Sequence, residues 1–292
     1  MMNQKASDKR LIIILGPTAV GKTDYSISLA QKYDSPIISC DSRQIYKEMR
    51  IGTAVPDAAQ LSAVQHYFIR TKSVTEYYTA GLYELDALEL IEKLFNEGHD
   101  TLVMSGGSMF YIDAVCNGMA EVPCANLELR AKLTAELKAT GSTALAERLR
   151  ELDPETYQSI DRSNGMRVLR ALEVCLDTGK PFSSFKVREP KKRNFTIEKI
   201  GLRRSREELY SRIDERVLKM VDEGLIEEVR SLNEFRNLTA LQTVGYKEVF
   251  NYLDNRISLD ETISSIQQNT RHYAKRQMTW WKKDPSIKWM DL

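Results

Sequence analysis

Continuous apolar runs alternate with helical patterns over the first 120 residues of the chain. Residues 11–15 are all aliphatic, and shorter apolar runs recur at 35–41 and 101–104. Between them, residues 82–97 repeat leucine and isoleucine near the helical period and end at Gly98. Buried strands that alternate with helices predict a parallel sheet covered on both faces. Residues 11–120 are therefore predicted to form an α/β core.

The pattern becomes helical near residues 122–123 and stays so up to Gly179, with a break at Gly141 and a predicted helix cap at Asn164. A basic stretch at 186–193 follows, and the apolar alternation at 195–202 predicts a strand that returns to the sheet. We therefore predict a helical insertion at 122–195, within a core formed by residues 1–121 and 196–292. Further helices are expected at 209–223 and 257–283.

A phosphate-binding motif follows the first apolar run directly. Residues 16–23 have the spacing G-x-x-x-x-G-K-T between a predicted strand and a predicted helix. In this motif backbone N–H groups surround a phosphate, the lysine adds positive charge, and the hydroxyl can bind Mg²⁺. The chain is therefore expected to bind a di- or triphosphate within a P-loop NTPase-like α/β fold. The loop consists of Gly16, Pro17, Thr18, Ala19, Val20, Gly21, Lys22 and Thr23.

Two neighbouring predicted strands end in different ways. The strand at 35–41 ends on Asp41, which could hold Mg²⁺, accept a proton from an acceptor molecule, or simply cap a helix. The strand at 101–104 runs into Ser105, Gly106 and Gly107, where a P-loop ATPase commonly has a carboxylate for Mg²⁺. This absence argues against nucleotide hydrolysis and suits a backbone that approaches a ligand closely.

Basic residues gather in two later segments. Arginines at 203, 204, 206, 212 and 216 follow the returning strand, where one could reach the P-loop or all could pair with nearby acids. Residues 270–283 contain no acid and interleave bases with aromatic side chains, as in a helix that binds a nucleic-acid backbone and stacks on bases. The alternative is an amphipathic helix whose aromatic residues, Trp280 among them, belong to the core.

Composition narrows the class of protein without identifying it. The 292 residues are 42% hydrophobic and 28% charged, with a net charge of +1, so any nucleic-acid site must be a local patch. The first ten residues lack the apolar stretch of a signal peptide, and no later run is long enough to span a membrane. The four cysteines (Cys40, Cys116, Cys124 and Cys175) form no C-x-x-C pair, which favours a reducing compartment and predicts a cytoplasmic protein.

Taken together, these stretches resemble the tRNA dimethylallyltransferase (tRNA isopentenyltransferase) family of bacterial type. The resemblance rests on residues 16–23, 41–46, 51–54, 106–108, 167–179, 243–248 and 275–280, in the family's order. It implies transfer of a dimethylallyl group from dimethylallyl diphosphate to N6 of adenosine 37 in tRNAs that read codons beginning with U. The P-loop would then hold the diphosphate that leaves, with Mg²⁺ as cofactor and the tRNA anticodon stem-loop as partner of a monomeric enzyme.

The family match assigns roles to individual residues. It implies that Asp41 is the general base, that Thr23 holds Mg²⁺, and that Arg216 and Lys22 stabilise the leaving diphosphate. The adenosine must be flipped out of its stack to reach Asp41, and the insertion is expected to close over the stem-loop. The implied tRNA contacts are Asp41, Ser42, Arg43, Gln44, Ser108, Arg130, Met166, Arg167, Val168, Leu169, Arg170, Gln242, Thr243, Val244, Gly245, Tyr246, Lys247, Lys275, Arg276, Gln277, Met278, Thr279, Trp280, Trp281 and Lys282.

The chain departs from the family pattern in a few places. Ser108 and Met109 stand where the family has threonine and glycine, which alters the surroundings of the expected prenyl pocket. Only His66 remains of a common His-His pair. Two rival functions stay open: a P-loop kinase or isopentenyltransferase that acts on free adenine nucleotides, and a tRNA-binding protein without catalysis. The first would need neither the insertion nor the basic C-terminal helix, and the second would not need Asp41.

Overall fold

The computed structural model of this chain describes residues 9–120, 122–123, 125–185 and 190–292. The chain divides into two compact units, Met1–Cys116 with Lys192–Leu292, and Asn117–Lys191. The second unit overlaps the predicted insertion, residues 122–195, but both of its ends lie earlier in the chain. Cys124 and residues 186–189 of the basic stretch lie outside the described residues.

The contacts of Arg193 explain why the chain rejoins the first unit at Lys192, before the predicted boundary at residue 195. Its guanidinium donates to the carbonyl oxygens of Val115 (2.8 Å) and Ala114 (2.9 Å) and to Glu84 Oε1 (2.9 Å). All three partners belong to the first unit, and both charged side chains are nearly buried. Sequence patterning could not find this boundary, because it depends on one long-range side-chain contact.

The first unit is built on a six-stranded sheet in the order β3-β2-β4-β1-β5-β6, in which every pairing is parallel. The expected strands at 11–15, 35–41, 101–104 and 195–202 are all present. The sequence did not predict the two edge strands, of which one has two residues and the other mixes polar with apolar positions. The strands are β1 Arg10–Leu15, β2 Ile37–Ser39, β3 His66–Tyr67, β4 Thr101–Ser105, β5 Thr196–Arg203 and β6 Ile287–Asp291.

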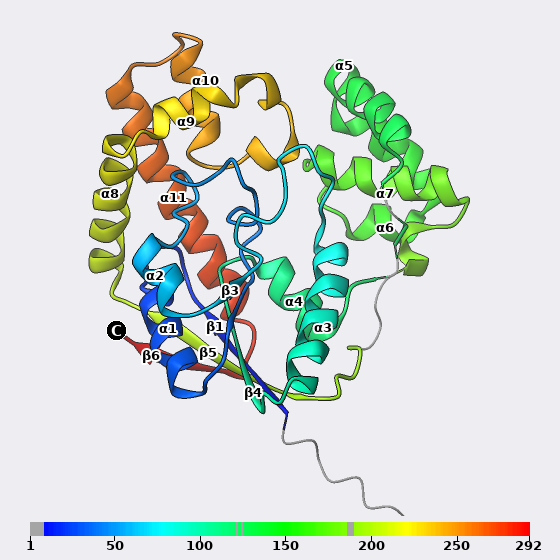
Figure 1. The fold of residues 1–292 in the computed structure, drawn as a ribbon. Helices are drawn as coiled ribbons and strands as arrows, with labels where there is room; N and C mark the ends of the chain where they lie inside the picture. Colours follow the sequence, from blue (N-terminus) through cyan, green and yellow to red (C-terminus); the bar gives the residue numbers. More distant parts are fainter. Residues whose placement is uncertain (1–8, 121, 124, 186–189) are drawn as a thin grey trace, which may run out of the picture. The chain divides into compact units, whose positions relative to one another are not determined.

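Helices cover both faces of this sheet (Figure 1). The expected helices at 82–97, 209–223 and 257–283 are present with shifted ends, and shorter ones complete the unit. No helix among the described residues is both long and apolar enough to cross a membrane. The helices are α1 Lys22–Lys32, α2 Ala58–Ala63, α3 Ala80–Asn96, α4 Met109–Asn117, α8 Arg206–Asp222, α9 Leu225–Ser231, α10 Tyr246–Leu253 and α11 Leu259–Trp281.

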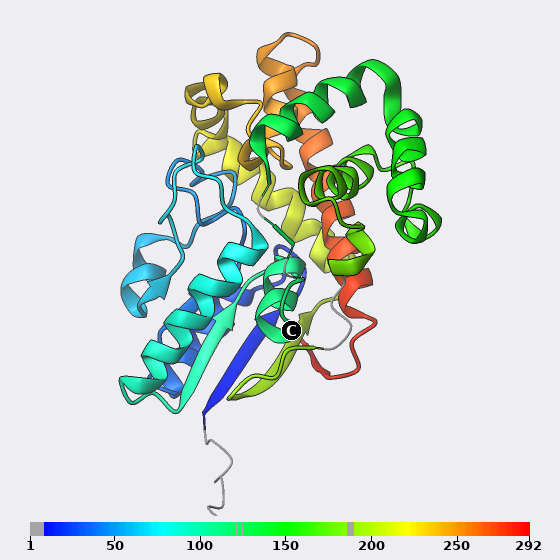
Figure 2. The ribbon, with the colours of Figure 1, turned by 90° about the vertical axis from the view of Figure 1, so that its right-hand side faces the viewer.

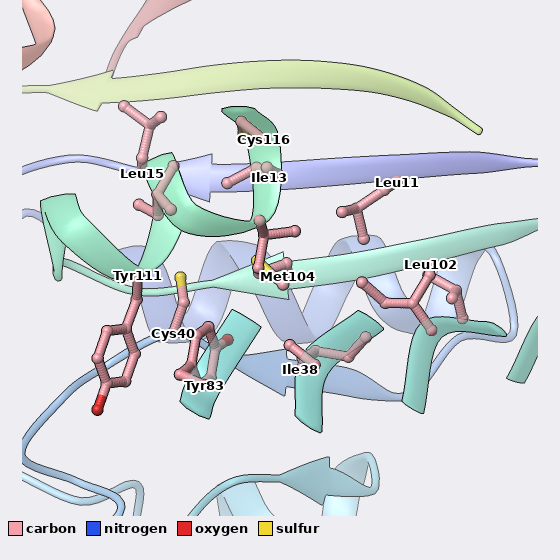
Figure 3. Packing of buried hydrophobic residues seen from close by; sticks show 14 of the residues in the cluster. Leu11, Ile13, Leu15, Ile38, Cys40, Tyr83, Leu102, Met104, Tyr111 and Cys116 are labelled. Carbon is pink, nitrogen blue, oxygen red and sulfur yellow. The ribbon is translucent and has the colours of Figure 1, made fainter. Parts of the chain in front are cut away.

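Strand β1 is aliphatic throughout because each of its faces meets a different core. Leu11, Ile13 and Leu15 point into a cluster with α3 and α4, shown in Figure 3. Ile12 and Ile14 point the other way, into a cluster with α1 and α8. Successive side chains of a strand alternate between faces, so a strand covered on both sides needs an unbroken apolar run.

The second unit is helical, as predicted, and has its own core. It contains α5 Leu127–Leu152, α6 Pro154–Ser159 and α7 Gly165–Thr178, with leucines of α5 and α7 packed together. Gly141 leaves helical geometry (φ 79°, ψ 176°) and bends α5, as Figure 2 shows. The predicted cap is confirmed, since the Asn164 side chain accepts a hydrogen bond from Arg167 N–H at the start of α7.

Candidate active site

A cavity of about 770 Å³ opens in the first unit at the ends of β1, β2 and β4. The carboxyl ends of parallel strands are where open α/β sheets bind their ligands. The cavity brings together the P-loop, Asp41, the turn after β4, one side of α8, and a segment at 50–61. Its volume suits a ligand of small-molecule size.

The P-loop itself needs backbone conformations that few residues adopt. Gly16 has φ +150°, and a Cβ there would lie 2.6 Å from the carbonyl oxygen of Leu202 on β5. Lys22 folds back over the loop and donates to the carbonyl oxygens of Gly16 (2.9 Å) and Pro17 (2.8 Å). Burial, reinforced by the charge of Arg216, lowers the pKa of Lys22 to about 8. The loop is thus already arranged around its lysine.

Three arginines also bind this loop. Arg204 Nε donates to Val20 O (2.9 Å), Arg212 Nε donates to Ala19 O (2.9 Å), and Arg216 Nη1 donates to Thr18 Oγ1 (3.2 Å). Arg204 also pairs with Glu208. Within the described ranges, neither Arg212 nor Arg216 has an acidic partner. The alternative in which all of these arginines pair with nearby acids is therefore wrong for these two.

Burial and the neighbouring Arg212 both lower the pKa of Arg216, while Asp41 acts in the opposite direction. Positive groups held close together in a cavity mark a place where an anion is expected. Lys22, Arg212 and Arg216 therefore form the cationic side of the cavity.

Asp41 lies in a turn rather than at a helix start. Its Oδ1 accepts the backbone N–H groups of Arg43 (2.8 Å) and Gln44 (3.2 Å), in a stretch of turns without a helix. The helix-cap interpretation is thus wrong in form, although one oxygen does hold the local backbone. Among the described residues nothing hydrogen-bonds to Oδ2, which leaves one carboxylate oxygen able to take a proton.

The turn after β4 approaches its neighbours closely because it lacks side chains. A Cβ on Gly106 would lie 2.5 Å from the backbone of Cys40, and one on Gly107 would lie 2.6 Å from Gln277. Gln277 links this turn to the P-loop, since its Oε1 accepts Thr18 N–H (2.9 Å) and its Nε2 donates to Gly107 O (2.8 Å). Gln277 is buried here, and its direct contact with tRNA stays a prediction.

Several other predicted tRNA contacts are also buried. Ser108 lies under the Asp41 turn, where its hydroxyl accepts Ser42 N–H at 2.7 Å and donates to Ser42 Oγ at 2.9 Å. Trp281 packs in the core that was suggested for Trp280, whereas Trp280 is exposed and bonded to Asp113. Ser108 holds the backbone of the Asp41 turn and Trp281 packs in the core, so neither side chain forms part of the exposed surface. The buried members of the predicted set are Ser108, Val168, Leu169, Gly245, Tyr246, Gln277 and Trp281.

Arg130 and Arg170 are only partly available to an RNA. Both bind Glu173 Oε2 in the second unit, at 2.7 Å and 3.1 Å, and the Glu173 side chain is 1% exposed. Arg170 also donates to Pro123 O at 2.7 Å. The remaining predicted contacts have exposed or half-buried side chains, namely Asp41, Ser42, Arg43, Gln44, Met166, Arg167, Gln242, Thr243, Val244, Lys247, Lys275, Arg276, Met278, Thr279, Trp280 and Lys282.

The donor set for a metal is sparse. No group of three or more His, Cys, Asp or Glu side chains that could hold a metal occurs among the described residues. The Thr23 side chain lines the cavity at the start of α1. Mg²⁺ commonly takes most of its ligands from substrate phosphates and water, and it needs few from the protein. One hydroxyl beside a diphosphate site fits that cation.

Met109 is not among the residues that line the cavity. It is the first residue of α4, where its partly buried side chain packs against the core formed by the sheet, α3 and α4. The apolar side chains that do line the cavity include Ile51, Val55, Leu61 and Met220. No sequence pattern indicates this set, because its members come from a loop, from α2 and from the distant α8.

Comparisons with known proteins agree with one another. Residues 44–284 match the family described as IPP transferase. The chain is 50% identical to tRNA dimethylallyltransferase 2 of Porphyromonas gingivalis over 98% of this chain and 95% of that protein. It is 47% identical to tRNA dimethylallyltransferase 1 of Bacteroides thetaiotaomicron over 96% and 90%.

Solved structures show the same fold. The tRNA isopentenylpyrophosphate transferase of Bacillus halodurans has a TM-score of 0.70 at 35% identity, covering 97% of this chain and 90% of that one. A eukaryotic dimethylallyltransferase acting on tRNA has a TM-score of 0.81 at 27% identity, covering 97% and 74%.

Proposed function

The chain belongs to the tRNA dimethylallyltransferase family, and we propose that its P-loop cavity is where a diphosphate leaves as adenosine attacks. Its activity is the transfer of a dimethylallyl group to tRNA. The observation that carries the assignment of the site is that Lys22, Arg216 and Asp41 line one cavity while β4 ends on Ser105 and two glycines. A kinase is disfavoured by the same turn and by the family.

In the proposed reaction, N6 of adenosine 37 forms a bond to the allylic carbon of dimethylallyl diphosphate. The bond from that carbon to the diphosphate oxygen breaks, and the diphosphate leaves with the bonding electrons. Negative charge grows on the diphosphate, where Lys22, Arg216 and the loop N–H groups stabilise it. Lys22 has three N–H donors and spends two on loop carbonyls, so one remains for a phosphate oxygen.

Asp41 completes the proton balance. The attacking nitrogen becomes positively charged unless it loses a proton, and a carboxylate within reach can accept it. Oδ1 of Asp41 is held by the turn, so Oδ2 is the oxygen that takes the proton. Thr23 would hold Mg²⁺ beside the diphosphate, and the bound cation would neutralise part of the phosphate charge.

The RNA partner is proposed to be the anticodon stem-loop of tRNAs that read codons beginning with U. Exposed residues at the end of α11 and directly after it supply bases and a stacking ring, namely Lys275, Arg276, Trp280 and Lys282. The other exposed side chains that the family resemblance assigns to tRNA are Met166, Arg167, Gln242, Lys247 and Thr279. A monomer working in the cytoplasm, where this substrate is found, completes the proposal.

The direct test uses an anticodon stem-loop, dimethylallyl diphosphate labelled in the allyl group, and Mg²⁺. We expect label on N6 of adenosine 37 and release of unlabelled diphosphate. Transfer of label to free AMP at a comparable rate would favour the small-molecule alternative. Binding of the stem-loop with no transfer of label at all would instead support the non-catalytic alternative.

A further inference from the structure

A short loop at residues 50–54, here called the wall loop, lines the cavity and is closed upon itself. Arg50, Ile51, Thr53 and Ala54 all contribute to the cavity lining. Within the loop, Ala54 N–H donates to Ile51 O at 2.9 Å, and the N–H of Val55, directly after the loop, donates to Arg50 O at 3.1 Å. These bonds alone do not connect the loop to the rest of the first unit.

The Glu228 carboxylate on α9 holds the wall loop in place. Glu228 Oε2 accepts the backbone N–H groups of Arg50 (2.9 Å) and Ile51 (2.7 Å), and Oε1 accepts that of Gly52 (3.0 Å). Three successive N–H groups thus converge on one side chain. Charged acceptors make the stronger hydrogen bonds of proteins, so this contact fixes the backbone of the loop firmly.

Tyr246, the first residue of α10, holds both Glu228 and the wall loop. Its hydroxyl donates to Glu228 Oε1 at 2.6 Å, and its ring lies so close to Gly52 that a Cβ there would be 2.6 Å from ring carbon Cε2. Burial, followed by the charge of Glu228, raises the pKa of Tyr246, so the hydroxyl stays protonated and keeps donating. The buried Tyr246 therefore serves this network, although the family resemblance placed it among tRNA contacts.

The wall loop in turn reaches the turn that carries Asp41. Gln44 Nε2 donates to the carbonyl oxygens of Thr53 (3.1 Å) and Ala54 (2.8 Å). The backbone N–H of the same Gln44 donates to Asp41 Oδ1. Hydrogen bonds from Glu228 to the wall loop, from the loop to Gln44 and from Gln44 to Asp41 therefore connect α9 with the proposed general base.

We infer that Glu228 is a positioning residue for prenyl transfer, which fixes the wall loop and through Gln44 orients the Asp41 carboxylate. This inference rests on the proposed function of Asp41. Under this inference the P-loop binds diphosphate without help from Glu228, whereas the transfer step, which needs Asp41, depends on Glu228. A displacement of about 1 Å in reacting groups can lower a rate by about 100-fold.

The test compares Glu228→Gln with Glu227→Gln, which changes the adjacent exposed acid in the same way. In Glu228→Gln an amide NH₂ faces N–H and O–H donors, so at least one acceptor is lost. We expect kcat/KM for transfer to the stem-loop to fall by about 10- to 100-fold, mainly through kcat. The affinity for inorganic diphosphate, measured by calorimetry, should stay within about twofold, and Glu227→Gln should match the wild type in both.

Tyr246→Phe provides a second variant that keeps the ring against Gly52 and removes only the bond to Glu228. We expect a smaller loss of kcat, about threefold to tenfold, again with unchanged diphosphate affinity. Equal kcat values in Glu228→Gln, Tyr246→Phe and the wild type would overturn the inference, as would a parallel loss of diphosphate binding, which would indicate general collapse. A wild-type protein that transfers no label refutes the proposed function itself, so the two failures are distinguishable.

Discussion

Arg212 and Arg216 in the first unit donate to uncharged oxygens of the P-loop, whereas Arg130 and Arg170 in the second unit converge on the carboxylate of Glu173. A carbonyl or hydroxyl partner orients a guanidinium and leaves its charge intact. A carboxylate partner cancels part of that charge and holds the side chain to its own helix bundle. Arginine thus prepares an anion site in one unit and braces a small helical core in the other.

The comparison also changes how the predicted RNA contacts of the second unit are understood. Arg130 and Arg170 share one buried acid, so together with Glu173 they carry a net charge of only +1 by simple addition of two positive and one negative group. Non-specific attraction to a phosphate backbone scales with the number of uncompensated cations. These arginines should therefore add less to RNA affinity than exposed bases such as Lys275 and Arg276.

The largest effect is expected from Asp41→Asn. Asparagine keeps an oxygen for the N–H groups of Arg43 and Gln44, so the turn should survive. The proton acceptor is lost, and we expect the rate of transfer to fall by about 10²- to 10⁴-fold. Single-turnover assays with labelled dimethylallyl diphosphate measure this rate, and gel-shift assays should show unchanged stem-loop affinity. A rate within threefold of the wild type would remove Asp41 from the mechanism.

Arg216→Gln tests the cationic side of the cavity directly. The glutamine side chain is shorter and uncharged, so both the bond to Thr18 Oγ1 and the charge that would stabilise the leaving group are lost. We expect kcat to fall by about 10²- to 10³-fold, as for other groups that stabilise charge developing in a transition state. Arg206→Gln is the matched control, because Arg206 lies on the same helix outside the cavity lining. Equal losses in both variants would mean that net charge, not position, matters.

Glu173→Gln breaks the opposite arrangement in the second unit. Loss of the buried carboxylate leaves Arg130 and Arg170 without their shared partner and should lower the free energy of unfolding by about 1–3 kcal/mol. Chemical denaturation measures this change, while diphosphate affinity should not move. Glu136→Gln, which removes an exposed pair with Arg148, should cost about 0.5 kcal/mol or less. A larger loss of unfolding free energy in Glu136→Gln than in Glu173→Gln would contradict this prediction.

The smallest effect concerns the pH dependence of diphosphate binding. Lys22 has a lowered pKa of about 8 in the free protein, and a bound anion favours its charged form and raises that pKa. Binding is therefore unaffected by Lys22 below pH 8, and it weakens by about tenfold per unit as pH rises above it. Calorimetry between pH 6.5 and 9.5 tests this expectation. Arginine in Lys22→Arg stays charged throughout this range, so its binding curve shows the titration of diphosphate alone. Identical curves of affinity against pH for the wild type and Lys22→Arg would contradict the prediction.

Local signals in the sequence were enough for much of the fold and part of the site. Apolar runs located three of the inner strands and apolar alternation located the fourth. The cap at Asn164 and the break at Gly141 could be predicted because each depends on its own neighbours. The P-loop and Asp41 were found in the same way. Edge strands β3 and β6 gave no pattern, since their place depends on the sheet they join.

Long-range contacts account for what the sequence did not reveal. Gln277 has the spacing of a surface residue on a basic helix, and only its two bonds to loops far away in the chain show that it is internal. Trp280 and Trp281 are adjacent and identical, so nothing local could decide which one is buried. Glu228 sits in an ordinary amphipathic helix, where its bonds to the wall loop have no sequence signature.

The bond from Thr18 N–H to Gln277 joins positions 259 residues apart. The P-loop is synthesised before α11, and contacts between positions so far apart in the chain form late in folding. A nascent chain therefore carries the complete phosphate-binding motif before α11, which supplies Gln277, has been synthesised. A product truncated before α11 would keep the phosphate-binding motif and lack the Gln277 side chain that holds it.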